Sequence, residues 1–109
     1  MRFKINDILW ETRFVDSGSR FLTRSDGSIT IGMTNGNTNI VYLDKHLRGR
    51  LLDKVIAHEL CHCVMFSYDI YMDIEQEEFL ADWFSNYGRD TVYLLDSLMT
   101  QLKNDRARA

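Results

Sequence analysis

The chain has 109 residues, of which 45% are hydrophobic and 27% charged, and it contains no proline. These proportions exclude a mainly disordered chain and predict one compact domain spanning residues 1–109. A formal net charge of -3 argues against direct binding of nucleic acid. No stretch reaches the roughly 20 apolar residues of a membrane span and no secretory signal is visible, so we expect a cytoplasmic protein with no membrane partner.

The first 44 residues alternate with the period of β-strands. Ile8–Val15 predicts a strand, although a short helix beginning at Asn6 or Asp7 is an alternative for the same stretch. Further strands are predicted at residues 21–23, 29–31 and 40–43, with turns at Asp26-Gly27 and Asn35-Gly36. We therefore expect an antiparallel sheet of three or four strands.

Beyond these strands the apolar residues recur with helical spacing. Residues 51–66 are apolar around nearly the whole helix axis, which predicts a buried central helix. Asp73, with Gln76 three residues later, is a good N-cap for a second helix, which we expect Gly88 to end. Asp90 then predicts the start of a third helix that contains four leucines. The expected fold class is α+β: a small antiparallel three- to four-stranded sheet packed on the buried helix, plus two C-terminal helices.

The predicted central helix contains the sequence H-E-L-C-H, which begins at His58. Two histidines four residues apart are separated by about 6 Å and about 40° on a helix, so His58 and His62 share one face and can bind one cation. Imidazole pairs of this kind suit zinc. Glu59 projects about 100° further around the helix, where its carboxylate can act as a general base on bound water. A histidine in an apolar helix is more commonly a core residue with a hydrogen-bond partner than a metal ligand. Here, however, His58, Glu59 and His62 would be three unpaired polar groups in an apolar core, at a cost of several kcal/mol.

Catalytic zinc also needs a third protein ligand. Glu78 and Asp82 lie one turn apart on one face of the predicted second helix, so Glu78 could bind the metal while Asp82 orients a ligand histidine. Glu77, Glu75 and Asp82 itself are alternative third ligands. A further alternative is that no third protein ligand exists. Because Glu77 has no acidic residue one turn further on, we expect it to contribute little. These glutamates could also form a solvated first turn that the helix dipole favours.

The H-E-L-C-H sequence, followed by the E-F-L-A-D-W-F run that begins at Glu78, resembles gluzincin-type HExxH zinc metallopeptidases. The resemblance is to the small ImmA/IrrE-like and phage-encoded minimal metallopeptidases in particular, and it covers roughly residues 40–87. In those families a Glu, then Ala and Asn or Asp three and four residues later, follows the zinc helix. The resemblance implies that His58, His62 and Glu78 hold Zn²⁺ and that Glu59 is the general base. It also implies a zincin-like fold and, for a phage-encoded protein, the host cytoplasm.

These expectations combine into zinc-dependent hydrolysis of a peptide bond, with Glu59 accepting a proton from the activated water. A peptide or protein substrate is what the resemblance implies, and an extended peptide could pair with a sheet edge at residues 29–33 or 39–43. Two alternatives are a non-catalytic zinc-containing phage or prophage accessory or binding protein, and a zinc hydrolase of a small amide. The sequence predicts no particular oligomeric state.

Other conspicuous side chains have simpler interpretations. Cys61 and Cys63 are expected to be reduced packing residues rather than metal ligands. His46 is a candidate fourth ligand or proton donor, but a surface histidine is expected. Four tyrosines are candidate oxyanion donors, none of them favoured individually: Tyr68, Tyr71, Tyr87 and Tyr93.

Overall fold

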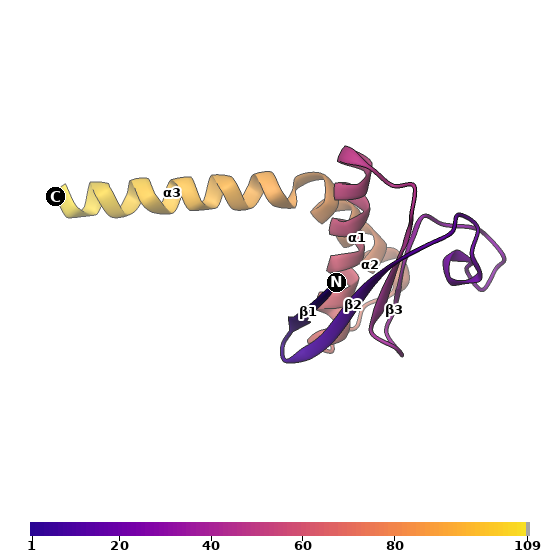
Figure 1. Cartoon of the computed structure of the whole chain (residues 1–109). Coiled ribbons are helices and arrows are strands. Elements are labelled where there is room, and N and C mark those ends of the chain that lie inside the picture. Colours follow the sequence, from indigo (N-terminus) through magenta and orange to yellow (C-terminus); the bar gives the residue numbers. More distant parts are fainter. Residues whose placement is uncertain (109) are drawn as a thin grey trace.

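The computed structural model describes residues 1–108, and side chains through residue 107. The elements, in chain order, are β1 (Arg2–Ile5), β2 (Ile8–Val15), the 3₁₀ turn η1 (Arg20–Leu22), β3 (Gly32–Asn35), β4 (Ile40–Asp44), α1 (Gly49–Ser67), α2 (Ile74–Trp83), the π-helical turn η2 (Phe84–Gly88) and α3 (Arg89–Arg108). Helix α1 lies between the sheet and α2, and α3 leads away from this body (Figure 1). The fold class is α+β, as predicted.

The four strands form one mixed sheet in the order β1-β2-β4-β3. Strands β1 and β2 are antiparallel, as are β3 and β4, but β2 and β4 are parallel, with Glu11 opposite Ile40 and Val15 opposite Asp44. The prediction of a purely antiparallel sheet is therefore wrong at its centre. The long 16–31 connection lets β3 pass to the outer edge, so that β4, the most apolar strand, fills the buried central position.

The hairpin of β1 and β2 was not predicted. Asn6 and Asp7 have φ values of 50° and 62°, the left-handed conformation that both central residues of a type I′ turn need and that Asn and Asp tolerate. Ile5 and Ile8 consequently pair directly across the turn. This geometry confirms the predicted strand at Ile8–Val15 and excludes the alternative helix.

The connection between β2 and β3 is mostly irregular. The strand predicted at residues 21–23 is wrong: residues 20–22 form η1, whose first turn Ser19 caps by accepting a hydrogen bond from Phe21 N. Residues 29–31 are not a strand either, since only Ile29 bridges, to Thr23. The Asp26-Gly27 turn is confirmed, with φ of Gly27 at 85°. The short capping bonds of this polar segment compete with extended pairing.

Helix α1 confirms and slightly extends the helix predicted at residues 51–66. The core between the sheet and α1 consists of Trp10, Val41, Leu43, Leu47 and Cys63. The prediction that α1 is buried on almost every side is wrong, because Leu51 is 54% and Ile56 40% exposed. The sheet, the short helix α2 and the turn η2 cover only part of its circumference.

The helical segments after α1 continue past Gly88, where the sequence predicted a helix end. Asp73 is the N-cap of α2, accepting a hydrogen bond from Gln76 N at 3.0 Å, as predicted. Gly88, however, does not adopt the left-handed conformation that ends many helices, and Arg89 after it is helical. Asp90 therefore lies within a continuing helix and is not an N-cap. Gly88 is instead needed for packing, because a Cβ there would lie 2.5 Å from the Phe84 ring. The result is a near-continuous helical path from α2 through η2 into α3.

Across the described residues, no helix combines the length and apolar character needed to cross a membrane.

Candidate metal centre

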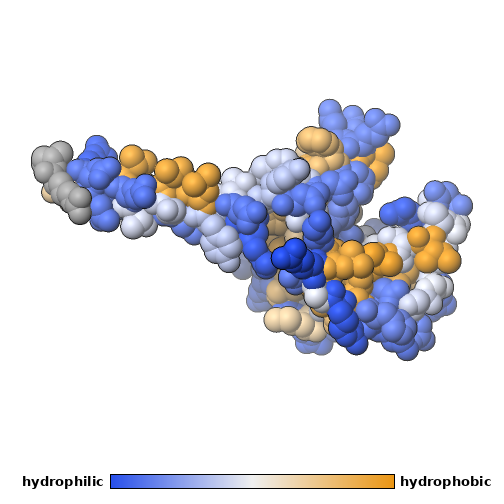
Figure 2. Space-filling view, turned by 90° about the horizontal axis from the view of Figure 1, so that it is seen from above, coloured by the Kyte–Doolittle hydropathy of each residue, from blue (hydrophilic) through white to orange (hydrophobic). Residues whose placement is uncertain are grey.

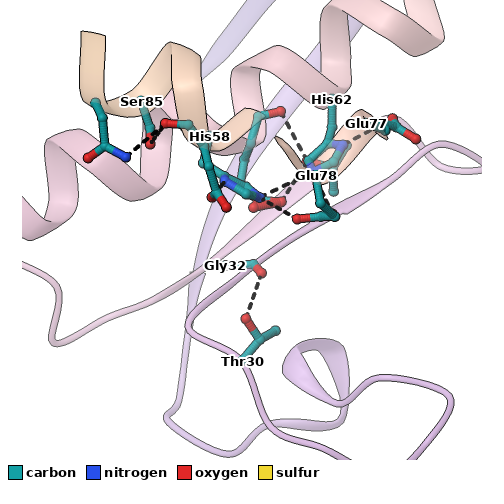
Figure 3. Close-up of polar contacts among 11 residues, drawn as sticks. Thr30, Gly32, His58, His62, Glu77, Glu78 and Ser85 are labelled. Atoms are coloured by element: carbon teal, nitrogen blue, oxygen red, sulfur yellow. Dashed lines mark hydrogen bonds and ion pairs between the residues drawn. The ribbon is translucent and has the colours of Figure 1, made fainter. Parts of the chain in front are cut away.

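Two histidines of α1 and one glutamate of α2 lie close together on one face of α1 (Figure 3). The Nε2 atoms of His58 and His62 lie 3.2 Å apart. Glu78 contacts both, with Oε2 at 3.1 Å from His58 Nε2 and Oε1 at 3.1 Å from His62 Nε2. The four-residue spacing on one helix face positions the imidazoles, and packing of α2 beside α1 supplies the carboxylate.

This donor set suits a metal ion. One ligand atom from each of His58, His62 and Glu78 lies within 4.8 Å of the others. Two imidazole nitrogens and one carboxylate oxygen are ligands that zinc accepts, and three protein ligands leave a fourth position open. The residues predicted as the metal site are thus brought together with the right chemistry to hold Zn²⁺.

Each histidine is also held at its far nitrogen by a second carboxylate. Asp82 Oδ1 lies 3.0 Å from His58 Nδ1, as the E-x-x-x-D spacing predicted. Glu77 Oε1 lies 3.0 Å from His62 Nδ1. Such contacts fix the tautomer and orientation of ligand imidazoles.

The expectation that Glu77 contributes little did not foresee its contact with His62. That expectation considered Glu77 only as a metal ligand supported by an acidic residue one turn later, at position 81. Glu77 can instead orient His62, and this role needs no acidic residue at position 81. The available signal was that two histidines need two orienting groups. Glu75 is exposed and lies outside the cluster.

Glu59 lies at the inner wall of the site and is only 6% exposed. Thr34 Oγ1 donates to Glu59 Oε1 at 3.1 Å and lies 3.2 Å from the Glu59 carbonyl oxygen. Burial raises the pKa of the Glu59 carboxyl, while the charges of His62 and His58 and the Thr34 hydrogen bond oppose that rise. Thr34 is a site residue that the sequence analysis missed, since nothing in the local pattern links position 34 to position 59.

Gly32 allows β3 to approach α1 closely. A Cβ at this position would lie 2.6 Å from Val55 Cγ1 and 3.3 Å from Glu59 Cγ. Any side chain would therefore push the strand away from the helix, and with it Thr34. The site depends on this glycine although Gly32 binds nothing itself.

A cleft of about 590 Å³ runs between β3 and the metal-ligand cluster. Its walls come from Thr30 to Thr34 on one side and from α1 and α2 on the other. Strand β3 is an edge strand beside this cleft, so the predicted edge at residues 29–33 overlaps it. The alternative edge at residues 39–43 is wrong, because β4 is paired on both sides.

The remaining candidates lie outside the cluster. Cys63 is fully buried, and burial raises the pKa of its thiol to about 12; burial also raises the pKa of Cys61. His46 contacts Ser17 and Asp44 at the end of β4 instead. Of the residues that line the cleft, none is among the four candidate oxyanion tyrosines.

No protein-family model matches this chain, and neither a curated protein sequence nor a solved structure is significantly similar to it.

Proposed function

We propose that this protein is a zinc-dependent hydrolase with a zincin-like arrangement that cleaves peptide bonds. The observation that supports the proposal most is the buried Glu59 carboxylate beside the His58, His62 and Glu78 cluster, in one cleft. A purely structural metal site has no use for an additional, separately oriented carboxylate at this place. The H-E-L-C-H resemblance supports the same chemistry.

The roles of the side chains follow from their contacts. A zinc ion held by His58, His62 and Glu78 would supply a Lewis acid that polarises a carbonyl and acidifies water. Thr34 occupies Oε1 of Glu59, which leaves Oε2 to accept a proton from the attacking water. The same atom can then deliver that proton to the leaving amine nitrogen, so that one peptide bond is exchanged for a carboxyl and an amine.

An extended peptide is the substrate that the cleft favours. Strand β3 pairs with β4 on one side only and follows the cleft wall from residue 32 to residue 34. A peptide in β-conformation could add to that edge by main-chain hydrogen bonds, which would hold its scissile carbonyl near the cluster. A small amide would have no use for such an edge.

Cleavage of a proteome-derived peptide mixture tests this proposal. Zinc-loaded wild-type protein should generate new peptide termini, detected by mass spectrometry, and Glu59→Gln should generate none while retaining zinc. Glu75→Gln is a matched control, because Glu75 lies outside the cluster. New termini in equal yield from Glu59→Gln, or none from the wild type, would overturn the proposal.

A further inference from the structure

Two cations line the cleft that contains the candidate metal centre. Lys54 comes from α1, and Arg24 comes from the connection between β2 and β3. Both residues are exposed. Exposed charges are ordinary on this protein, since hydrophilic residues cover most of the face seen in Figure 2. Lys54 and Arg24 are distinguished by their place in the cleft and by their lack of acidic partners there.

The four carboxylates that line the cleft all have polar partners within 3.1 Å: Glu59, Glu77, Glu78 and Asp82. The cations differ, because no side chain described in the structure forms an ion pair with Lys54 or Arg24. One turn away from Lys54 on α1 lie Arg50 and His58, neither of them an acid. Asp26 lies near enough for its charge to interact with Arg24, but its carboxylate accepts a hydrogen bond from Ser28 N. The cleft therefore offers two positive charges to an anion.

Lys54 extends the row of side chains that contains the two candidate metal ligands of α1. Four cleft-lining residues follow one another at intervals of four, which places them along one side of the helix: Lys54, His58, His62 and Phe66. The row begins with a cation, has the two histidines at its middle and ends with an aromatic ring. A substrate that lies along the row meets the Lys54 charge on one side of the metal centre only.

Strand β3 runs beside this row in the same order. A Cβ on Gly32, its first residue, would lie 2.6 Å from Val55 Cγ1, and a Cβ on Gly36, just after the strand, would lie 2.5 Å from Phe66 Cε1. A peptide paired with the free edge of β3 would therefore extend past the metal centre toward Lys54. Four residues of a helix span about 6 Å, which is about two residues of an extended peptide.

Arg24 approaches the cleft from the strand side. A tight turn fixes its backbone, because Arg24 N donates to the Ser28 carbonyl at 2.8 Å and the Arg24 carbonyl accepts from Gly27 N at 2.9 Å. The chain then continues through Thr30, which also lines the cleft, into β3. The two cations thus come from separate elements of the fold.

From these positions we propose that Lys54 and Arg24 bind a carboxylate of the substrate peptide, about two or three residues from the scissile bond. Ammonium and guanidinium groups form strong, charge-assisted hydrogen bonds with carboxylates, and positive charge in a cleft attracts anionic ligands. The carboxylate is either an Asp or Glu side chain or the C-terminus of the peptide, since both present the same group. This inference rests on the proposed function, because it concerns the substrate of that same cleft.

The cleavage sites in a proteome-derived peptide mixture test the position of the carboxylate. If a side chain is bound, Asp and Glu should be enriched two or three residues from the cut, on one side only. If the C-terminus is bound, cuts should fall two or three residues from it, and amidation of the peptides should lower their yield. Cuts that show neither pattern would overturn the inference and leave the proposed hydrolase standing.

Charge reversal assigns the preference to the two cations. The measured quantity is kcat/KM for a carboxylate peptide divided by kcat/KM for its Gln or amide counterpart. Lys54→Glu and Arg24→Glu should each lower this ratio by roughly two- to five-fold or more at low ionic strength. Lys4→Glu is the matched control, because it makes the same change of charge on β1, outside the cleft, and should keep the wild-type ratio. Circular dichroism and zinc content verify that each variant folds.

An unchanged ratio in Lys54→Glu would overturn the inference, and an unchanged ratio in Arg24→Glu would overturn the part of Arg24. Binding separates either result from a failure of the proposed function. Zinc-loaded Glu59→Gln should bind carboxylate peptides of a synthetic decapeptide array more tightly than amidated neutral ones, and adding Lys54→Glu should remove that preference. This preference in a protein that cleaves no peptide would overturn hydrolysis but support the carboxylate site. Absence of both cleavage and preference would overturn both.

Discussion

Glu77 and Glu78 are neighbours on α2, yet they contact opposite nitrogens of the same imidazole. Glu78 Oε1 lies 3.1 Å from His62 Nε2, and Glu77 Oε1 lies 3.0 Å from His62 Nδ1. Successive residues on a helix point about 100° apart, so the two carboxylates reach around the ring from two sides. In the proposed metal site, Glu78 would bind the ion and Glu77 would orient the ligand His62.

This relationship predicts an order of zinc affinities. Glu78→Ala, which removes a ligand, should weaken zinc binding most. Glu77→Ala and Asp82→Ala should each weaken it by roughly 10- to 100-fold, since each removes the partner of one ligand histidine. Competitive titration with a chromophoric chelator measures the order, and Glu75→Ala should match wild type. Wild-type affinity in Glu77→Ala would show that its contact with His62 has no effect on the metal.

The proposed metal site predicts one zinc ion per chain. His58→Ala and His62→Ala should each lose the ion during gel filtration, because two protein ligands hold zinc much more weakly than three. Elemental analysis of the purified variants measures the stoichiometry. His46→Ala should retain zinc, as His46 lies with Ser17 and Asp44 at the far end of β4. Zinc retained by both cluster variants would eliminate the site.

Thr34 predicts a positioning effect that is separate from metal binding. Thr34→Val should keep zinc but lower kcat, because Glu59 loses the hydrogen bond at Oε1. The loss should stay below the 10²- to 10⁴-fold typical of a general base itself. Thr34→Ser, which restores the hydroxyl, should recover activity, and a pH–rate profile should shift in Thr34→Val alone. An unshifted profile with unchanged kcat would contradict the role.

Gly32 predicts a steric conflict that a second substitution relieves. Gly32→Ala should lower the free energy of unfolding by about 1–3 kcal/mol, the usual cost of overpacking, because the new Cβ would lie 2.6 Å from Val55 Cγ1. Val55→Ala removes that methyl group, so the double variant should lose less than the sum of the single losses. Urea denaturation of the four proteins measures this coupling. Additive losses would exclude the clash as the cause.

Asp44 predicts a pH-dependent part of the stability. Its carboxylate accepts hydrogen bonds from His46 N at 2.8 Å and from Ser17 Oγ at 2.7 Å, and these bonds lower its pKa below the ordinary 3.8. A lowered folded-state pKa stabilises the fold fully at pH values above 3.8 and loses that contribution as pH falls through the folded value. Asp44→Asn should therefore be less stable than wild type at neutral pH, with the difference shrinking in acid. Urea unfolding across pH measures it, and a difference independent of pH would contradict the assignment.

Local chemistry made several features predictable from the sequence. The extent of α1, the Asp73 cap and the strand at residues 40–43 follow from neighbouring residues alone. The shared face of His58 and His62 follows from helix geometry, which any helical H-E-x-x-H has regardless of the rest of the fold. The pairing of Glu78 with Asp82 was accessible for the same reason.

Only the tertiary structure decided what depends on distant contacts. The parallel pairing of β2 with β4 joins residues about 29 positions apart in sequence, and no local pattern encodes its direction. Gly88 is a typical helix terminator by sequence, but the chain continues in helical conformation at Arg89 and the Phe84 ring packs against Gly88. Thr34 reaches Glu59 from another element, and Glu77 meets His62 only because α2 packs beside α1. Spacing along one helix determines which side chains share a face, whereas packing between elements decides which groups hold them in place.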